Sequence, residues 1–207
     1  MVAVVVFGAG GRTGRLVVEE ALRAGHVVTA AARGPLDLDD RPGARAVQVD
    51  VRDAEAVATA VAGQDAVVCA VGPSGRTAAG LYSAAARSIV AGMAVTGVDR
   101  LVAVTSSGVR LDDPHHPWWY RLLARTVMRE AYGDMRRMEE IVRASGVDYT
   151  FVRPARLVDE PATSTVRIVD GANPPHGLRV TRADLARFVV EELTARRWSR
   201  AAPTMAE

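Results

Sequence analysis

Short apolar runs alternate with longer segments of helical periodicity along most of the chain. The apolar runs are rich in valine and alanine, which is typical of parallel strands covered on both faces. We predict strands at 2–7, 27–32, 45–49, 66–71, 101–106 and 148–153. Alternating strands and helices that feed a parallel sheet predict an α/β fold, with a doubly wound and mostly parallel sheet.

The segments between these runs carry apolar residues at three- and four-residue spacing. The first of them ends at Gly25, a residue typical of helix C-termini. Thr181 followed by Asp184 is a capping signal before the last of these segments. We predict helices at 12–24, 54–62, 76–96, 134–145 and 182–195.

The pattern changes after the sixth strand. Residues 154–181 are predicted to form loops on the substrate side of the sheet, with a candidate last strand at 165–170. The final helix is placed within 182–197, and 198–207 is predicted to be a flexible tail. Since no repeat or linker divides 1–197, we predict a single domain with a small C-terminal extension.

Composition and charge narrow the class of protein. The 207 residues are 49% hydrophobic and 24% charged, which is typical of one globular domain. The net charge of +2 without a basic block argues against nucleic-acid binding. No apolar run reaches the roughly 20 residues that cross a bilayer, and the N-terminal run lacks the basic residues of a signal peptide. With a lone cysteine, Cys69, these features predict a cytoplasmic protein.

The basic residues restrict the chemistry further. All 26 of them are arginine, and the chain contains no lysine. Because arginine stays protonated, Schiff-base chemistry and lysine-assisted acid–base catalysis are excluded. No His, Cys or acidic residues have metal-ligand spacing, and the adjacent His115 and His116 are poor ligands as a pair, so we predict no metal.

A glycine-rich turn, Gly8-Ala9-Gly10-Gly11-Arg12-Thr13-Gly14, joins the first strand to the first helix. This is the setting of the dinucleotide-binding motif of the Rossmann fold. Gly8 permits the tight turn, Gly11 lets the backbone approach a pyrophosphate, and Gly14 lets helix and strand pack closely. The helix N-terminus then directs its N–H groups at the phosphates.

The second strand ends in Arg33, where NAD-selective folds place Asp or Glu. A guanidinium there pairs with a 2′-phosphate, and Arg12 can clasp the same group; the alternative is a solvated loop arginine. We therefore predict NADP(H) as the cofactor. The predicted cofactor site comprises Gly8, Gly10, Gly11, Arg12, Thr13, Gly14, Arg33, Asp50, Val51, Ala70, Val71, Gly72, Thr105 and Arg153.

With these residues the chain resembles the atypical short-chain dehydrogenases/reductases, specifically the NmrA-like branch that includes biliverdin-IXβ and flavin reductases. The resemblance rests on the glycine turn, Asp50-Val51, and the segments 101–107, 145–154 and 180–188. It implies the Rossmann fold and NAD(P) binding. The branch contains reductases, isomerases and NADP-sensing regulators, so the substrate is not implied.

The resemblance also implies an active-site role for Ser106. Its hydroxyl would orient a substrate carbonyl or relay a proton, and the alternative is a hydroxyl that caps the strand end. The superfamily's Tyr-x-x-x-Lys pair has no counterpart in register. Alignment through 145–146 places Met135 at the lysine position and Ala131 at the tyrosine position.

Tyr132 and Arg136 have the same spacing as that pair but lie one residue out of register, which rotates a helical side chain by about 100°. Tyr132 is therefore either an acid catalyst or a packing and pocket residue.

An aromatic segment at 112–120 follows the fifth strand, where a lid over the pocket would lie. Trp118, Trp119 and Tyr120 would stack on a flat aromatic substrate, or would serve as a hydrophobic anchor or dimer contact. Arg153 and Arg156 would bind a substrate carboxylate or form ion pairs that close the sheet. The predicted substrate site comprises Ser107, Trp118, Trp119, Pro154 and Arg156.

These features favour an NADPH-dependent reductase that transfers hydride to a small conjugated or aromatic acceptor, such as a flavin, quinone or enone, without a Tyr–Lys pair. Ser106 and Tyr132 are its catalytic candidates. One alternative is an NADP(H)-sensing regulator that acts through a partner. Another is a non-redox isomerase or cyclase that retains the cofactor. If the protein is a reductase, its partner is a small-molecule substrate, and we predict a monomer or a homodimer.

Overall fold

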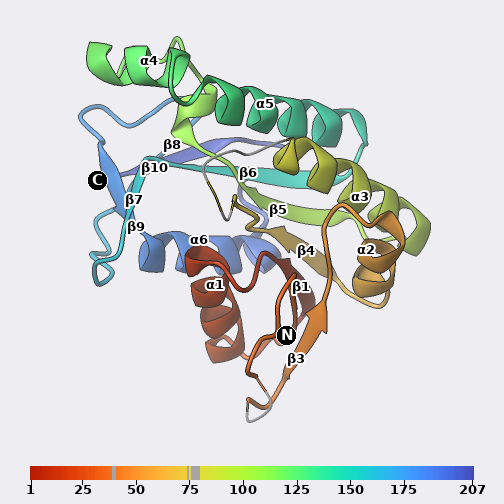
Figure 1. Ribbon diagram of the computed structural model, residues 1–207. Coiled ribbons are helices and arrows are strands. Elements are labelled where there is room, and N and C mark those ends of the chain that lie inside the picture. Colours follow the sequence, from red (N-terminus) through yellow and green to blue (C-terminus); the bar gives the residue numbers. More distant parts are fainter. Residues whose placement is uncertain (39–40, 74, 76–79) are drawn as a thin grey trace.

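A mostly parallel sheet forms the centre of the protein (Figure 1). The computed structural model describes residues 1–38, 41–73, 75 and 80–207. The strands of the sheet are β1 (Ala3–Phe7), β2 (Val27–Ala32), β3 (Ala44–Gln48), β4 (Ala66–Cys69), β5 (Arg100–Val104), β6 (Asp148–Pro154), β8 (Arg167–Asp170) and β10 (Pro203–Ala206). Their order, β3-β2-β1-β4-β5-β6-β10-β8, is that of a doubly wound Rossmann domain, so the predicted fold class is confirmed.

Helices cover both faces of the sheet (Figure 1). The helices are α1 (Arg12–Arg23), α2 (Ala54–Val61), α3 (Leu81–Thr96), α4 (Trp118–Arg125), α5 (Arg129–Ala144) and α6 (Arg182–Ala195). One apolar cluster joins α1 and α6 to one face, and a second joins α2, α3 and α5 to the other. β1 and β4 are apolar throughout because both of their faces are buried. No helix within the described ranges is long and apolar enough to cross a membrane.

The six predicted strands all form, each within two residues of its predicted bounds. The last helix begins at Arg182 as predicted and ends at Ala195, because Arg196 adopts a left-handed conformation. α5 begins at Arg129, earlier than the predicted 134, so Tyr132 lies inside it. Of the helix predicted at 76–96, residues 76–79 lie outside the described residues and Leu81–Thr96 is helical.

The prediction of a flexible tail at 198–207 was wrong. β10 within this segment is buried, and it runs between β6 and β8, parallel to the first and antiparallel to the second. Its sequence, Pro-Thr-Met-Ala, has too little apolar pattern to indicate a strand. The two neighbouring strands, distant in sequence, provide its hydrogen bonds and its burial.

The segment 154–181 contains more than the predicted loops. β7 (Arg156–Val158) and β9 (Arg179–Thr181) pair as a small parallel sheet, and β8 falls within the candidate strand at 165–170. This small sheet fixes the chain that follows β6 beside the carboxyl end of the main sheet, where the candidate site lies (Figure 1).

The buried side chain of β10 gives a direct test of the corrected C-terminus. Met205 is 1% exposed, so Met205→Ala should lower the free energy of unfolding by about 2–5 kcal/mol, measured by urea denaturation. Val95→Ala on α3, where the side chain is 78% exposed, should change it little. If both variants unfold like the parent protein, the segment is a mobile tail after all.

Candidate active site

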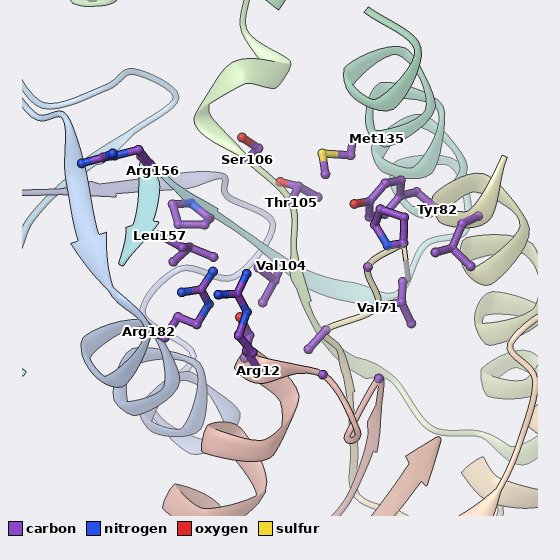
Figure 2. A pocket seen from close by; sticks show the side chains of 18 of the residues that line it. Arg12, Val71, Tyr82, Val104, Thr105, Ser106, Met135, Arg156, Leu157 and Arg182 are labelled. Carbon is purple, nitrogen blue, oxygen red and sulfur yellow. The ribbon is translucent and has the colours of Figure 1, made fainter. Parts of the chain in front are cut away.

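A cavity of about 1340 Å³ lies along the carboxyl ends of β1, β2, β4, β5 and β6 (Figure 2). Doubly wound sheets bind ligands at this edge, where the strand order reverses beside β1. The volume exceeds the roughly 300–1,000 Å³ of sites for a single small ligand. The cavity therefore has room for a dinucleotide and a second molecule.

Two glycines bring α1 against the end of β1. Gly8 has a φ of +85°, and a Cβ there would lie 2.6 Å from the carbonyl oxygen of Ala70. A Cβ on Gly14 would lie 2.1 Å from the carbonyl oxygen of Gly8. Both positions therefore exclude a side chain, as the sequence motif requires.

The exposed part of the turn fits a phosphate group. A Cβ on Gly11 would lie 3.3 Å from the carbonyl oxygen of Gly8, and one on Gly10 would make only ordinary contacts at 3.5 Å. A side chain thus fits at Gly10, whereas one at Gly11 would press on the backbone of the turn. Gly11 caps α1 without a side-chain hydrogen bond, and the first turn of α1 has no acidic residue. The helix N-terminus can therefore bind an anion through its backbone N–H groups.

The other side of the glycine turn faces the carboxyl end of β2. Arg33 is exposed there and lines the cavity, and its carbonyl accepts a hydrogen bond from Gln48 at 3.0 Å. Val51 is buried and also lines the cavity. Asp50 is not among the lining residues; its carboxylate accepts from the N–H of Arg52 at 3.0 Å. Of these two predicted cofactor residues, only Val51 reaches the cavity.

Arg12 extends from the glycine turn toward the start of α6. Its guanidinium pairs with Asp159 at 2.9 Å, and the same carboxylate pairs with Arg182 at 2.6 Å. Figure 2 shows Arg12 and Arg182 side by side at the edge of the cavity. The structure thus engages Arg12 with the segment after β7, whereas the sequence analysis placed it with Arg33.

Arg153 is not among the residues that line the cavity. It is buried, and its guanidinium binds both carboxylate oxygens of Glu139, from Nε to Oε1 at 2.9 Å and from Nη2 to Oε2. Thr105 donates to the same carboxylate at 3.1 Å. The ion pair therefore ties β6 to α5 and fixes the end of β5, which is the second of the two roles considered from the sequence.

Ser106 lies at the carboxyl end of β5 and lines the cavity (Figure 2). Its Oγ accepts a hydrogen bond from the N–H of Gly108 at 3.2 Å, so its own proton remains available to a neighbour.

Tyr132 lines the cavity from α5, and its hydroxyl lies 2.9 Å from that of Tyr120. Close packing holds the Tyr132 ring: a Cβ on Gly108 would lie 2.3 Å from it.

Burial, and next the neighbouring Tyr120, raise the pKa of Tyr132 above its ordinary value. Burial likewise raises the pKa of Tyr82, which lines the cavity from the start of α3, to about 12. Both hydroxyls therefore stay protonated at neutral pH and act as hydrogen-bond donors. Neither is activated as the tyrosine of a Tyr–Lys pair is.

Met135 occupies the place predicted from the alignment. It is buried in α5 and lines the cavity (Figure 2). Arg136 is not a lining residue, and its guanidinium donates to the carbonyl of Val109 at 3.3 Å. The spacing of Tyr132 and Arg136 therefore does not bring both side chains into the cavity.

An aromatic wall closes one side of the cavity. Trp119 lines it, whereas Trp118 is 72% exposed and is not among the lining residues. His116, which the sequence did not assign to the site, is buried; its Nε2 lies 3.1 Å from the carbonyl oxygen of Ser107, and its ring lies 4.6 Å from that of Tyr120. The remaining predicted substrate residues, Ser107, Pro154 and Arg156, line the cavity, as do the predicted cofactor residues Ala70, Val71, Gly72 and Thr13.

Several lining residues were missed from the sequence, namely Tyr82, His116, Leu123, Met128 and Arg182, whereas Tyr120, predicted beside the two tryptophans, lines the cavity. The four-residue spacing of Trp119 and Leu123 was the available signal, because it places both on one face of α4.

Comparison with known proteins identifies the family. The model of a family described as NAD(P)H-binding matches residues 8–196. The chain belongs to this NAD(P)H-binding family. The match spans the glycine turn and the last helix, and it confirms the resemblance inferred from the sequence.

Solved structures share the whole fold. Anaerobilin reductase from Escherichia coli O157:H7 is 24% identical with a TM-score of 0.84, over 99% of this chain and 97% of that one. A proposed NADH–flavin reductase from Streptococcus pneumoniae is 22% identical with a TM-score of 0.80, over 100% of both chains. A short-chain dehydrogenase/reductase from Veillonella parvula, in complex with NADP, is 17% identical with a TM-score of 0.81, over 100% and 95%. At these identities the likeness shows the fold.

The glycine turn can be tested separately from folding. Gly11→Ala should lower the melting temperature by only roughly 2–4 °C, since its methyl group would lie 3.3 Å from the carbonyl oxygen of Gly8 and the turn must shift slightly. It should weaken NADPH binding by about tenfold or more in a titration, because the methyl group stands where a phosphate approaches the backbone. Gly133→Ala, inside α5 and outside the cavity, is the matched control and should bind NADPH as the parent does. Equal affinities of all three proteins would place the dinucleotide elsewhere.

Proposed function

We propose that this protein is an NADPH-dependent reductase of small conjugated or aromatic acceptors, such as flavins, quinones or enones. One observation carries the proposal: a single cavity joins the glycine turn to the hydroxyl of Ser106 and an aromatic wall. Membership of the NAD(P)H-binding family supports the cofactor, and the fold shared with reductases supports the reaction class.

The chain's own residues provide two anion sites for the cofactor. The N–H groups at the start of α1 would hold the pyrophosphate, and Arg33 would bind the 2′-phosphate that distinguishes NADPH from NADH. Ala70, Val71 and Gly72 leave space beside the end of β4 for the rest of the molecule. When bound, NADPH supplies a hydride to the acceptor.

Ser106 is the proposed donor to the substrate. Because its Oγ already accepts from Gly108, its O–H can point into the cavity and bind a carbonyl oxygen of the acceptor. The acceptor gains one hydride and one proton, and the proton comes from Ser106 or directly from solvent. Water then returns a proton to Ser106.

The Tyr132 hydroxyl is proposed to position Ser106 and the substrate. It lies within hydrogen-bond distance of the Tyr120 hydroxyl, and its raised pKa keeps it protonated. With Met135 at the lysine position there is no cation to lower that pKa. A conjugated acceptor spreads the charge that arrives with hydride, so it needs a weaker acid than a simple ketone does.

The preference for NADPH can be measured directly. Arg33→Ala should weaken NADPH binding by about tenfold and leave NADH binding nearly unchanged, since the guanidinium pairs only with the 2′-phosphate. Fluorescence titrations with both cofactors measure this ratio. A parent protein that binds NADH more tightly than NADPH would contradict the assignment.

The reaction is tested by following NADPH oxidation against a panel of flavins, quinones and enones. Ser106→Ala should lower kcat/KM by about a hundredfold at unchanged NADPH affinity, and Tyr132→Phe should lower it by about tenfold. The exposed Ser199→Ala serves as the matched control. If NADPH binds tightly but no acceptor is reduced, the non-redox and cofactor-sensing alternatives replace this proposal.

A further inference from the structure

The charge of the cavity lining is strongly one-sided. Of the described residues that line it, five are arginines and none is Asp or Glu, the five being Arg12, Arg15, Arg33, Arg156 and Arg182. A cleft lined by one sign of charge concentrates ions of the opposite sign.

The cofactor accounts for the arginines on one side only. In doubly wound folds the dinucleotide crosses the sheet from β2 to β5, with its phosphates at the turn after β1. Arg12, Arg15 and Arg33 belong to that turn, to α1 and to the end of β2. Arg156 follows β6, on the far side of Ser106 from β2, and Figure 2 shows it apart from Arg12.

Nothing in the described part of the chain neutralises Arg156. Its guanidinium has no hydrogen-bond or ion-pair partner there, whereas Arg182 and Arg12 share the single carboxylate of Asp159. Arg182 therefore shares one carboxylate with Arg12, whereas Arg156 has none within ion-pair distance among the described residues. The backbone of Arg156 is fixed, because β7 pairs with β9, so the side chain is attached to a rigid support.

The opposite wall of the cavity is apolar. Trp119, Leu123, Met128 and Met135 line it from α4, α5 and the turn between them. A ligand that is complementary to both the apolar wall and the arginine side has a flat apolar body and an acidic group at one end. The hydroxyl of Ser106 lies at the end of β5, and β5 runs between the strands that carry the cofactor turn and Arg156.

We propose that Arg156, supported by Arg182, forms an anion subsite that selects acceptors with an aromatic body and a carboxylate or phosphate group. This inference rests on the proposed reductase function and names its substrate class. Arg156 is a specificity-determining residue and takes no part in hydride or proton transfer. Its guanidinium binds either anion through paired, charge-assisted hydrogen bonds.

Flavins provide a matched pair of probes, because FMN and riboflavin share the ring and differ by a phosphate. Binding is measured by flavin fluorescence with the protein saturated in NADP⁺, so that no turnover occurs. FMN should bind about tenfold more tightly than riboflavin, and added salt should reduce the difference. Naphthoate and its neutral amide, as competitors of FMN, show whether a carboxylate serves as well as a phosphate.

Arg156→Gln should remove the preference for the anionic member of each pair and leave NADP⁺ affinity unchanged. Arg156→Lys should restore part of the preference. Arg87→Gln removes the same charge from an exposed position of α3 outside the cavity, and it should behave as the parent does.

The outcomes separate this subsite from the reductase itself. A protein that binds NADP⁺ but shows no FMN binding, or equal affinities for both flavins, overturns the anion subsite and leaves the reductase proposal standing. An Arg156→Gln variant that keeps the full preference overturns it equally. A protein that binds neither NADP⁺ nor NADPH contradicts the proposed function.

Discussion

The close contact between the start of α1 and the end of β1 determines the geometry of the whole site. With no Cβ on Gly14, the helix can lie against the carbonyl of Gly8, from which a Cβ would be only 2.1 Å away. Gly8 in turn approaches the backbone at Ala70, the first residue after β4. These contacts aim the N–H groups of α1 at the cavity and bring the ends of β1 and β4 together, where the strand order reverses. A larger side chain at either glycine would separate the helix from the sheet and remove the phosphate site with it.

The parts of the fold that local sequence determines were predicted well. β1, β2 and β4 are apolar runs that need both faces covered, so their composition indicates them without knowledge of their neighbours. β10 is different, because its four residues become a strand only through pairing with β6 and β8. Arg100 is a similar case. It is fully buried and donates to Thr150 and to the carbonyl of Glu192, partners that the sequence around it does not reveal.

The residues of the candidate site divide in the same way, into those that local sequence places and those that depend on a partner elsewhere in the chain. The glycine turn and the strand ends were found from the sequence because each lies within one strand–turn–helix unit. Arg153 was predicted beside the cofactor, yet Glu139 on α5 binds it instead. Tyr120 was predicted only as a residue that stacks on a substrate, and His116 was not assigned to the site; their hydrogen-bond partners, Tyr132 and Ser107, are not indicated by the sequence around them. Residues whose role depends on a distant partner therefore escaped prediction, whereas residues with a local role did not.

The absence of lysine gives the site its chemical character. Met135 lines the cavity at the position that the alignment gives to the lysine, and the buried tyrosines keep their protons, so in our proposal Ser106, Tyr132 and the apolar wall position the substrate. The most direct measurement is a crystal structure of the complex with NADP⁺. We expect the pyrophosphate on the N–H groups at Gly11–Thr13 and the nicotinamide between Ser106 and Met135. A dinucleotide bound outside this cavity, or with its adenine beside Ser106, would contradict the assignment.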